Sequence, residues 1–354
     1  MSKLLALTPF HIYPPTFGGA ERCWNLLSRL GPIDIIALNW EGHNAKAQLG
    51  DVNYQLIAAD AKAVERAIKL RKSGVKTFDP MPSLTANDLT TVRQAIDDSD
   101  PDLVILEHPW LIDLIEDRPF IYDAHNCETV NTGQQHGRNS YDYELVKDLE
   151  KRAAQNAEHV TYCNINDINQ MSAMFNINTP TTLIPNGINL PDEIATGESR
   201  NLIFIGSAYQ PNVNAAQRLA NLAPALPDYT IQIIGACGHY INAPFPNVQI
   251  IGQVNEETMH NLFINAHAFI NLVTEGSGTH LKLARALAYG LPVITTPEGA
   301  RGYTNVTITG LNNVITTITN LNWEEHHNER LQEADTLNWD TLAERYRATI
   351  RRYL

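Results

Sequence analysis

The sequence lacks the features that mark several large classes of protein. Its four cysteines are scattered without a CxxC pair, so neither a disulfide framework nor a cysteine-based zinc site is expected. It has no run of about 18 apolar residues, which argues against a membrane-spanning helix. The apolar run at its start ends at Pro9, too early for a secretory signal. We therefore expect reduced, buried thiols and a cytoplasmic protein.

The chain is also poor in basic residues. Lys and Arg total 26 against 39 Asp and Glu, a net charge of -13, so nucleic acid is not expected as a partner. Apolar residues make up 44% and charged residues 18% of the 354 residues, a composition typical of globular proteins. A chain of this length is expected to form two domains.

Short apolar runs alternate with helical periodicity through the first half. The runs lack polar alternation, as in strands that are buried on both faces of a parallel sheet, so an α/β architecture is predicted. The expected strands are residues 3–10, 34–40, 102–108, 119–126 and 159–164, and the expected helices are 20–30, 61–72, 87–97 and 142–156.

The pattern then restarts. Residues 201–206 read as the first strand of a second sheet, which continues through residues 230–235, 247–252, 268–273 and 292–296. We assign residues 1–190 to a first domain and 191–335 to a second. Residues 336–354 contain an amphipathic helix with Trp339, Leu342, Tyr346 and Ile350 on one face.

Two candidate phosphate-binding turns lie between a strand and a helix. Gly18 and Gly19 let the backbone approach a ligand at a helix start, although a plain tight turn explains them equally well. The second is the run EGSGTHLK from Glu275 to Lys282, where Lys282 can add a charge to free N–H groups. A helix cap with a solvated lysine is the alternative. Neither turn is GxGxxG or a P-loop.

A third motif, DAHN at residues 123–126, ends a predicted strand. In open α/β sheets ligands bind at the carboxyl ends of strands, so His125 is a candidate catalytic residue. A histidine that caps the strand by local hydrogen bonds is the alternative. The DSD run at Asp98–Asp100 imitates a metal-binding motif but ends a predicted helix, and we interpret it as a solvated turn.

These motifs, in this order, resemble the retaining glycosyltransferase family 4 of the GT-B fold. The resemblance covers Gly18-Gly19, DAHN, IPNG at 184–187, FIGS at 204–207 with Pro211-Asn212, and 275–290 continuing into LPVITTPEGARG. It implies two Rossmann-like domains that face each other across a cleft. The first would lie on the acceptor side and the second would bind the donor, with the last helix crossing back to the first.

By the resemblance, the protein transfers a sugar with retention from a nucleoside diphosphate sugar, with no metal or other cofactor. Its acceptor is a glycan, a lipid-linked or a protein-linked group. His125 and Glu275 would contact the donor sugar. The phosphates would be held by Lys282 together with a set of small residues: Gly18, Gly19, Gly206, Ser207, Ser277, Gly278 and Thr279.

Arg285 departs from the family pattern, because the glutamate that binds the donor ribose in the family aligns with it. We expect Arg285 to face the donor pocket and to contact the donor or Glu298; a side chain that points away is the alternative. The departure keeps two other functions open. One is a non-catalytic GT-B protein that binds a nucleotide or glycan or supports a partner, and the other is a GT-B sugar-nucleotide epimerase.

Basic residues gather at two places: residues 62–76, and residues 345–352 with Arg345, Arg347, Arg351 and Arg352. A basic amphipathic helix can lie on an anionic bilayer. We expect weak, peripheral contact with the inner face of an anionic membrane; an ordinary solvated face is the alternative.

Overall fold

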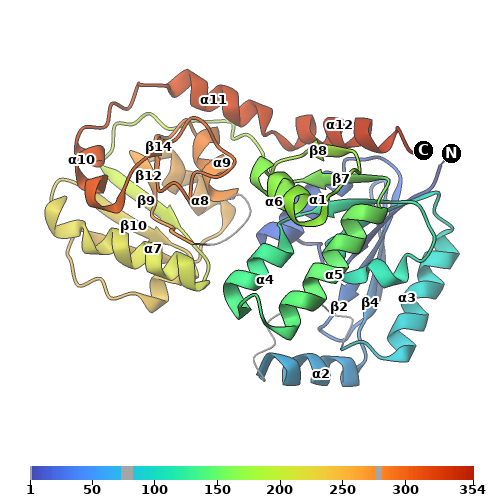
Figure 1. Ribbon diagram of the computed structural model, residues 1–354. Coiled ribbons are helices and arrows are strands. Elements are labelled where there is room, and N and C mark those ends of the chain that lie inside the picture. The colour runs from blue at the N-terminus through green and yellow to red at the C-terminus, as the bar shows by residue number, and fades with distance from the viewer. Residues whose placement is uncertain (1, 73–82, 276–280) are drawn as a thin grey trace. The chain divides into compact units, whose positions relative to one another are not determined.

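A computed structural model describes residues 2–72, 83–275 and 281–354 (Figure 1). The chain divides into two compact units. The first unit is Met1–Pro185 with Leu342–Leu354, and the second is Asn186–Thr341. The break after Pro185 lies a few residues before the position expected from the sequence.

The first unit is built on a sheet that, over the described residues, has the strand order β3-β4-β2-β1-β5-β6-β7-β8. All neighbouring strands are parallel except β3 and β4. The strands are β1 Leu4–Thr8, β2 Ile33–Asn39, β3 Ala45–Leu49, β4 Val52–Ala58, β5 Leu103–Glu107, β6 Phe120–Ala124, β7 His159–Tyr162 and β8 Thr181–Leu183. The helices are α1 Gly18–Leu27, α2 Ala61–Lys72, α3 Ala86–Ser99, α4 Glu128–His136, α5 Tyr141–Asn156 and α6 Ile165–Phe175.

The central strands β1, β5 and β6 are buried at every residue, which confirms the reading of their unbroken apolar runs. The antiparallel pair β3–β4 was not expected. β3 is exposed at its first four residues and has no buried residue. In β4, buried Val52, Tyr54 and Leu56 alternate with more exposed residues up to Leu56, and Ile57 is buried as well. An edge hairpin with one wet face explains both patterns.

The second unit is built on a sheet whose described strands have the order β11-β10-β9-β12-β13-β14, all parallel. This order confirms the expected second parallel sheet. The strands are β9 Asn201–Ile205, β10 Thr230–Ile234, β11 Val248–Gly252, β12 Ala268–Asn271, β13 Val293–Thr295 and β14 Thr307–Ile308. The helices are α7 Gln210–Asn221, α8 Glu256–Ile264, α9 Leu281–Ala288, α10 Val314–Thr319 and α11 His327–Thr336.

The last helix, α12 (Trp339–Ile350), begins in the second unit and continues into the first. The four apolar residues predicted to share one face of it are buried. Two of its basic residues are engaged within the first unit, because Arg345 donates to the carbonyl of Leu183 at 2.7 Å and Arg347 donates to that of Arg29. Among the described helices, none is long and apolar enough to cross a membrane.

Candidate functional site

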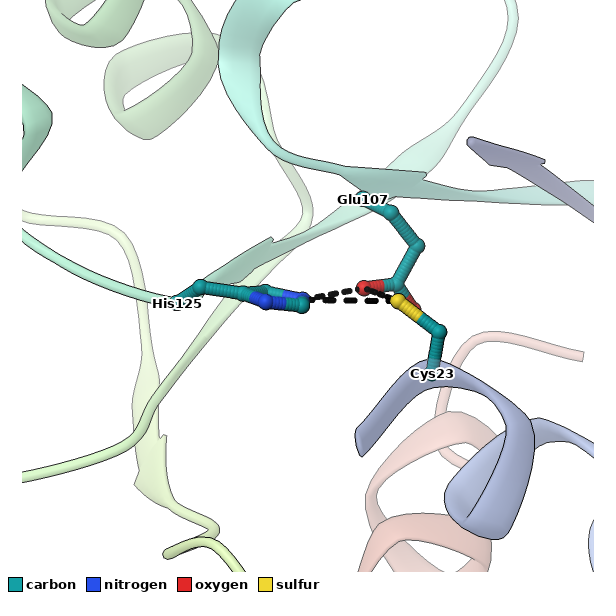
Figure 2. A group of neighbouring side chains, drawn as sticks. All are labelled: Cys23, Glu107 and His125. Carbon is teal, nitrogen blue, oxygen red and sulfur yellow. Dashed lines mark hydrogen bonds and ion pairs between the residues drawn. The ribbon is translucent and has the colours of Figure 1, made fainter. Parts of the chain in front are cut away.

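His125 lies just past the end of β6, beside Glu107 at the end of β5. Both strands are parallel and adjacent, so their carboxyl ends present these side chains at the same sheet edge. His125 Nε2 lies 2.6 Å from Glu107 Oε2, and Cys23 Sγ of α1 lies 3.3 Å from the same oxygen and 3.7 Å from His125 Nε2. Figure 2 shows the three side chains converging from three elements.

Burial sets the protonation state of Glu107 and His125. His125 is 7% exposed and Glu107 is fully buried. Burial raises the pKa of Glu107 to about 8, assisted by the charge of Asp123. Burial also lowers the pKa of His125 to about 4. Near neutral pH the pair therefore holds one proton between Glu107 Oε2 and His125 Nε2, and the imidazole is uncharged.

An ion pair fixes the strand end that carries His125. Arg22 of α1 binds Asp123 through two nitrogens, with Nη2–Oδ1 at 2.9 Å and Nε–Oδ2 at 3.1 Å. Both side chains are buried, and Thr161 donates a further hydrogen bond to Asp123 at 2.6 Å. Burial opposes ionisation of Asp123, but the charge of Arg22 outweighs it and keeps the pKa of Asp123 below its usual value. The removal of one partner from such a pair costs about 3–5 kcal/mol.

Gly18 and Gly19 are the first two residues of α1, as the sequence predicted for a helix start. The N-cap residue, Phe17, makes no side-chain capping hydrogen bond. A Cβ on Gly19 would lie 3.0 Å from the ring of Phe17. The glycine therefore allows the Phe17 ring to pack closely over the helix start.

In the second unit, the end of β9 leads into a tightly packed turn at Gly206 and Ser207. A Cβ on Gly206 would lie 2.8 Å from Asn212 Cβ and 3.1 Å from Cys237 Sγ. Gly235, with φ +89°, brings its own Cα close to the carbonyl of Gly206, so that a Cβ there would lie 2.4 Å from that oxygen. Both positions therefore require glycine, and the turn holds Asn212 over the end of the strand.

Lys282 of α9 reaches this turn. Its Nζ donates to Asn212 Oδ1 at 2.6 Å and lies 4.6 Å from the centroid of the Phe204 ring. Asn212 in turn donates to Ser207 Oγ at 3.2 Å. Burial lowers the pKa of Lys282 to about 7. Within the described ranges, no carboxylate forms an ion pair with Lys282, so its positive charge is balanced by an amide oxygen and an aromatic ring alone.

Glu275 is exposed and accepts a hydrogen bond from Asn214 of α7 at 3.2 Å. The helix α7 therefore carries the partner of Lys282 and the partner of Glu275 within one turn. Ser277, Gly278 and Thr279, expected to cradle a phosphate, lie outside the described residues.

The carboxylate partner of Arg285 differs from the expected Glu298, while its contact with the donor stays a prediction. Arg285 Nη1 pairs with Glu256 Oε2 of α8 at 3.1 Å, whereas Glu298 pairs with Arg301 at 3.6 Å. From the sequence, Glu298 was the group expected to neutralise Arg285 or to take over the ribose contact. Glu256 lies in the first turn of α8, across from α9, and no motif marked it.

The DSD run at Asp98–Asp100 lies at the end of a helix, as the sequence predicted. α3 ends at Ser99, and Asp100 is its C-cap in the left-handed conformation. The two carboxylates turn to separate partners, since Asp98 accepts from Gln94 at 2.8 Å and Asp100 pairs with Lys3 at 3.4 Å.

Comparison with known proteins agrees with the motifs. Residues 199–321 match the family model described as glycosyl transferases group 1. This segment contains Gly206, Asn212, Glu275 and Lys282 and lies within the second unit. The chain has the GT-B fold, which the solved structures described below share. Glycosyl transfer is the function that the family match supports, and over residues 199–321 this match agrees with the resemblance stated from the motifs.

Solved structures match over nearly the whole chain. Sucrose-phosphate synthase from Thermosynechococcus elongatus is 15% identical, with a TM-score of 0.74 over 99% of this chain and 98% of that one. The E. coli trehalose-6-phosphate protein bound with UDP-2-fluoro glucose is 11% identical, with a TM-score of 0.72 over 98% of both chains. HepE of Anabaena, in complex with UDP, is 14% identical, with a TM-score of 0.67 over 99% of both. No curated protein sequence matches the chain.

Sequence reasoning missed Glu107, Arg22 and Asn212 as members of these clusters. Glu107 could have been predicted from the sequence, because Glu107-His108 ends the strand expected at residues 102–108 just as Asp123 to Asn126 ends the neighbouring strand. Arg22 carried no signal beyond its position after Gly18-Gly19. Asn212 belonged to a matched motif, but its contact with Lys282 depends on a turn that only the fold brings together.

Proposed function

We propose that the protein is a retaining glycosyltransferase that moves a sugar from a nucleoside diphosphate sugar to a glycan, lipid-linked or protein-linked acceptor without a metal ion. The family match over residues 199–321 supports glycosyl transfer. Retention follows from the resemblance of the motifs to family 4. Because two neighbours are described with UDP or a UDP-sugar, uridine nucleotides are the first donors to test.

The observation that carries the proposal is the environment of Lys282. A partly buried ammonium that donates to the amide oxygen of Asn212 is less stable than one that pairs with an anion. A diphosphate placed against Nζ would supply that anion and raise the pKa of Lys282 from about 7. In the reaction the same contact would stabilise the charge that develops on the departing diphosphate.

Metal independence is part of the proposal. Many glycosyltransferases neutralise the diphosphate with a divalent ion held by carboxylates. Here the proposed counter-charge is Lys282, with the Ser207 hydroxyl and the N–H of Gln210, the first residue of α7, as further donors. The helix α7 supports this role because its N-cap, Tyr209, makes no side-chain capping hydrogen bond.

In the first unit, the proposed role of His125 is contact with the donor sugar. An uncharged imidazole that shares a proton with Glu107 can present its other nitrogen as a hydrogen-bond donor. Arg22 and Asp123 would hold the strand end in place while Glu107 sets the tautomer.

The substitution Lys282→Ala tests the proposal. The loss of a charged contact to the leaving group is expected to raise the barrier by about 3 kcal/mol, which is about a hundredfold in rate. Release of nucleoside diphosphate from a sugar nucleotide measures it, with Lys151→Ala on an exposed face of α5 as the matched control. Activity of K282A close to that of wild type would show that Lys282 has no part in the reaction.

One observation favours a second candidate, a non-catalytic nucleotide-binding protein. Arg285 stands where the family has its ribose-binding glutamate, and it is already paired with Glu256. In that case nucleotides would stabilise the fold, but no sugar nucleotide would be turned over with or without an acceptor.

A further inference from the structure

The cluster of Cys23, Glu107 and His125 combines three different metal-ligand atoms in one buried place. Sulfur, oxygen and nitrogen come from α1, β5 and the end of β6, and the three atoms lie within 4.8 Å of one another. All three residues are buried. Figure 2 shows the carboxyl group of Glu107 between the imidazole and the sulfur.

We propose that this cluster is a binding site for a thiophilic divalent cation, with Zn²⁺ as the best match. In a tetrahedral zinc site the bond lengths of about 2.0–2.3 Å separate neighbouring ligand atoms by about 3.3–3.6 Å. The Cys23 Sγ–Glu107 Oε2 and Cys23 Sγ–His125 Nε2 distances are 3.3 and 3.7 Å. Only the Glu107–His125 distance of 2.6 Å must open, which small side-chain rotations would achieve.

A second observation points to a ligand. Glu107 Oε1 is buried and, among the residues that the structure describes, has no hydrogen-bond partner. A buried carboxylate oxygen without a partner is costly in a folded protein. A cation held by Oε2 would lie within reach of Oε1 of the same carboxylate, so this oxygen could become a further ligand.

The charges and ligand types select the cation. A divalent ion with one thiolate and one carboxylate forms a neutral unit, and the neighbouring Arg22 is already balanced by Asp123. Binding would release the thiol proton of Cys23 and the proton held between Glu107 and His125, so the site would gain no net charge. A thiolate and an imidazole suit Zn²⁺ and disfavour Mg²⁺ and Ca²⁺, which prefer oxygen ligands.

Occupancy would change the state of His125. The cation takes Nε2, the atom that lies against Glu107, and so replaces the hydrogen bond between them. Because the Glu107–His125 distance must open on binding, the imidazole would rotate and displace its other nitrogen, which is proposed above to contact the donor sugar, so Zn²⁺ would act as an inhibitor of the enzyme. This consequence rests on the proposed function, whereas binding of the cation does not.

Cobalt provides a direct probe of the site in the full-length protein, because a thiolate bound to Co²⁺ gives a charge-transfer band in the near ultraviolet. The chelator-treated protein is titrated with Co²⁺ and then with Zn²⁺. We expect a band that saturates at one equivalent of Co²⁺ and disappears on addition of Zn²⁺. Absence of the band in the wild-type protein would overturn the proposal.

Variants assign the band to this cluster. Cys23→Ser should abolish it, while Cys127→Ser should keep it, because Cys127 is also buried but lies 3.8 Å from Glu150 in a different cluster. Glu107→Gln keeps the shape of the side chain and a polar group in the cluster but loses the anionic ligand, so Zn²⁺ affinity should fall by about tenfold or more. Unchanged affinity in Glu107→Gln, or a band that survives in Cys23→Ser, would contradict the site.

Inhibition is measured separately, by release of nucleoside diphosphate with and without one equivalent of Zn²⁺. Because the cobalt spectrum does not depend on activity, failure of the proposed enzyme function leaves the metal site standing. Failure of the cobalt titration in turn leaves the enzyme function standing.

Discussion

At the scale of single residues, Lys282 should make the affinity for a sugar nucleotide fall as the pH rises. Its pKa in the ligand-free protein is about 7 because of burial, and an anionic diphosphate favours the charged form. Below this pH the lysine is already protonated. Above it, a proton must be taken up on binding, so the affinity for a sugar nucleotide should fall by about tenfold per pH unit. Calorimetric titration from pH 6 to 9 measures this, and the slope should vanish in K282A; a slope that persists there belongs to another group.

Arg285 is the other residue whose role needs an experiment. It is 22% exposed at its side chain and paired with an exposed Glu256, and an exposed pair of this kind contributes little stability. If Arg285 also contacts the donor, Arg285→Ala should lower turnover by about tenfold, or about 1.4 kcal/mol. Glu256→Gln serves as the control and should change turnover by less than Arg285→Ala. Equal effects of the two variants would mean that only their mutual contact matters.

Some of the site residues could be predicted from the sequence, and others could not. His125, Glu275 and Lys282 stand out because they end strands or begin helices in recognisable motifs. The partner of Arg285 could not be read in the same way. Glu256 and Arg285 are separated along the chain and meet only because α8 and α9 lie close together, and nothing in the sequence near either residue indicates that packing.

At the scale of secondary-structure elements, the turn after β9 depends on the absence of a side chain. Gly206→Ala would place a Cβ 2.8 Å from Asn212 Cβ, which would push α7 and the partner of Lys282 away. Overpacking of this kind costs about 1–3 kcal/mol, so we expect a lower melting temperature and weaker nucleotide binding. Gly310→Ala is the matched control, since a Cβ there meets nothing within 4 Å and φ is -77°. A G206A protein as stable as G310A would show that the turn is not tightly packed.

Strands that are buried on both faces could be predicted from the sequence, whereas strands with a solvent-exposed face were harder to predict. The strands β1, β5, β6 and β9 are mostly apolar, with polar residues near their ends, and lie in the middle of their sheets. β3 has no buried residue along its five positions, so its place depends on pairing with β4 and not on its own composition. The alternation of Val52, Tyr54 and Leu56 was the available signal for that hairpin.

At the scale of the whole molecule, the GT-B assignment was accessible from the sequence because several motifs occurred in the right order. Several of the motifs lie at the end of a strand, where a parallel sheet presents ligand-binding groups, as DAHN ends β6 and FIGS ends β9. Gly18-Gly19 instead begins the helix α1. The solved structures that share this fold are at most 15% identical among those compared, so fold similarity leaves the donor and the acceptor open. Those depend on side chains, and they need direct measurement.

The central claim is that the protein turns over a nucleoside diphosphate sugar without a metal ion. The most direct test incubates the protein with UDP-, GDP- and ADP-sugars in excess EDTA and measures release of the nucleoside diphosphate, with and without a mixture of glycan acceptors. We expect release from at least one donor, with uridine donors first, at a rate unchanged by EDTA. Release that disappears in EDTA and returns with manganese would contradict metal independence. Stabilisation by a nucleotide without release from any donor would contradict the enzyme function itself.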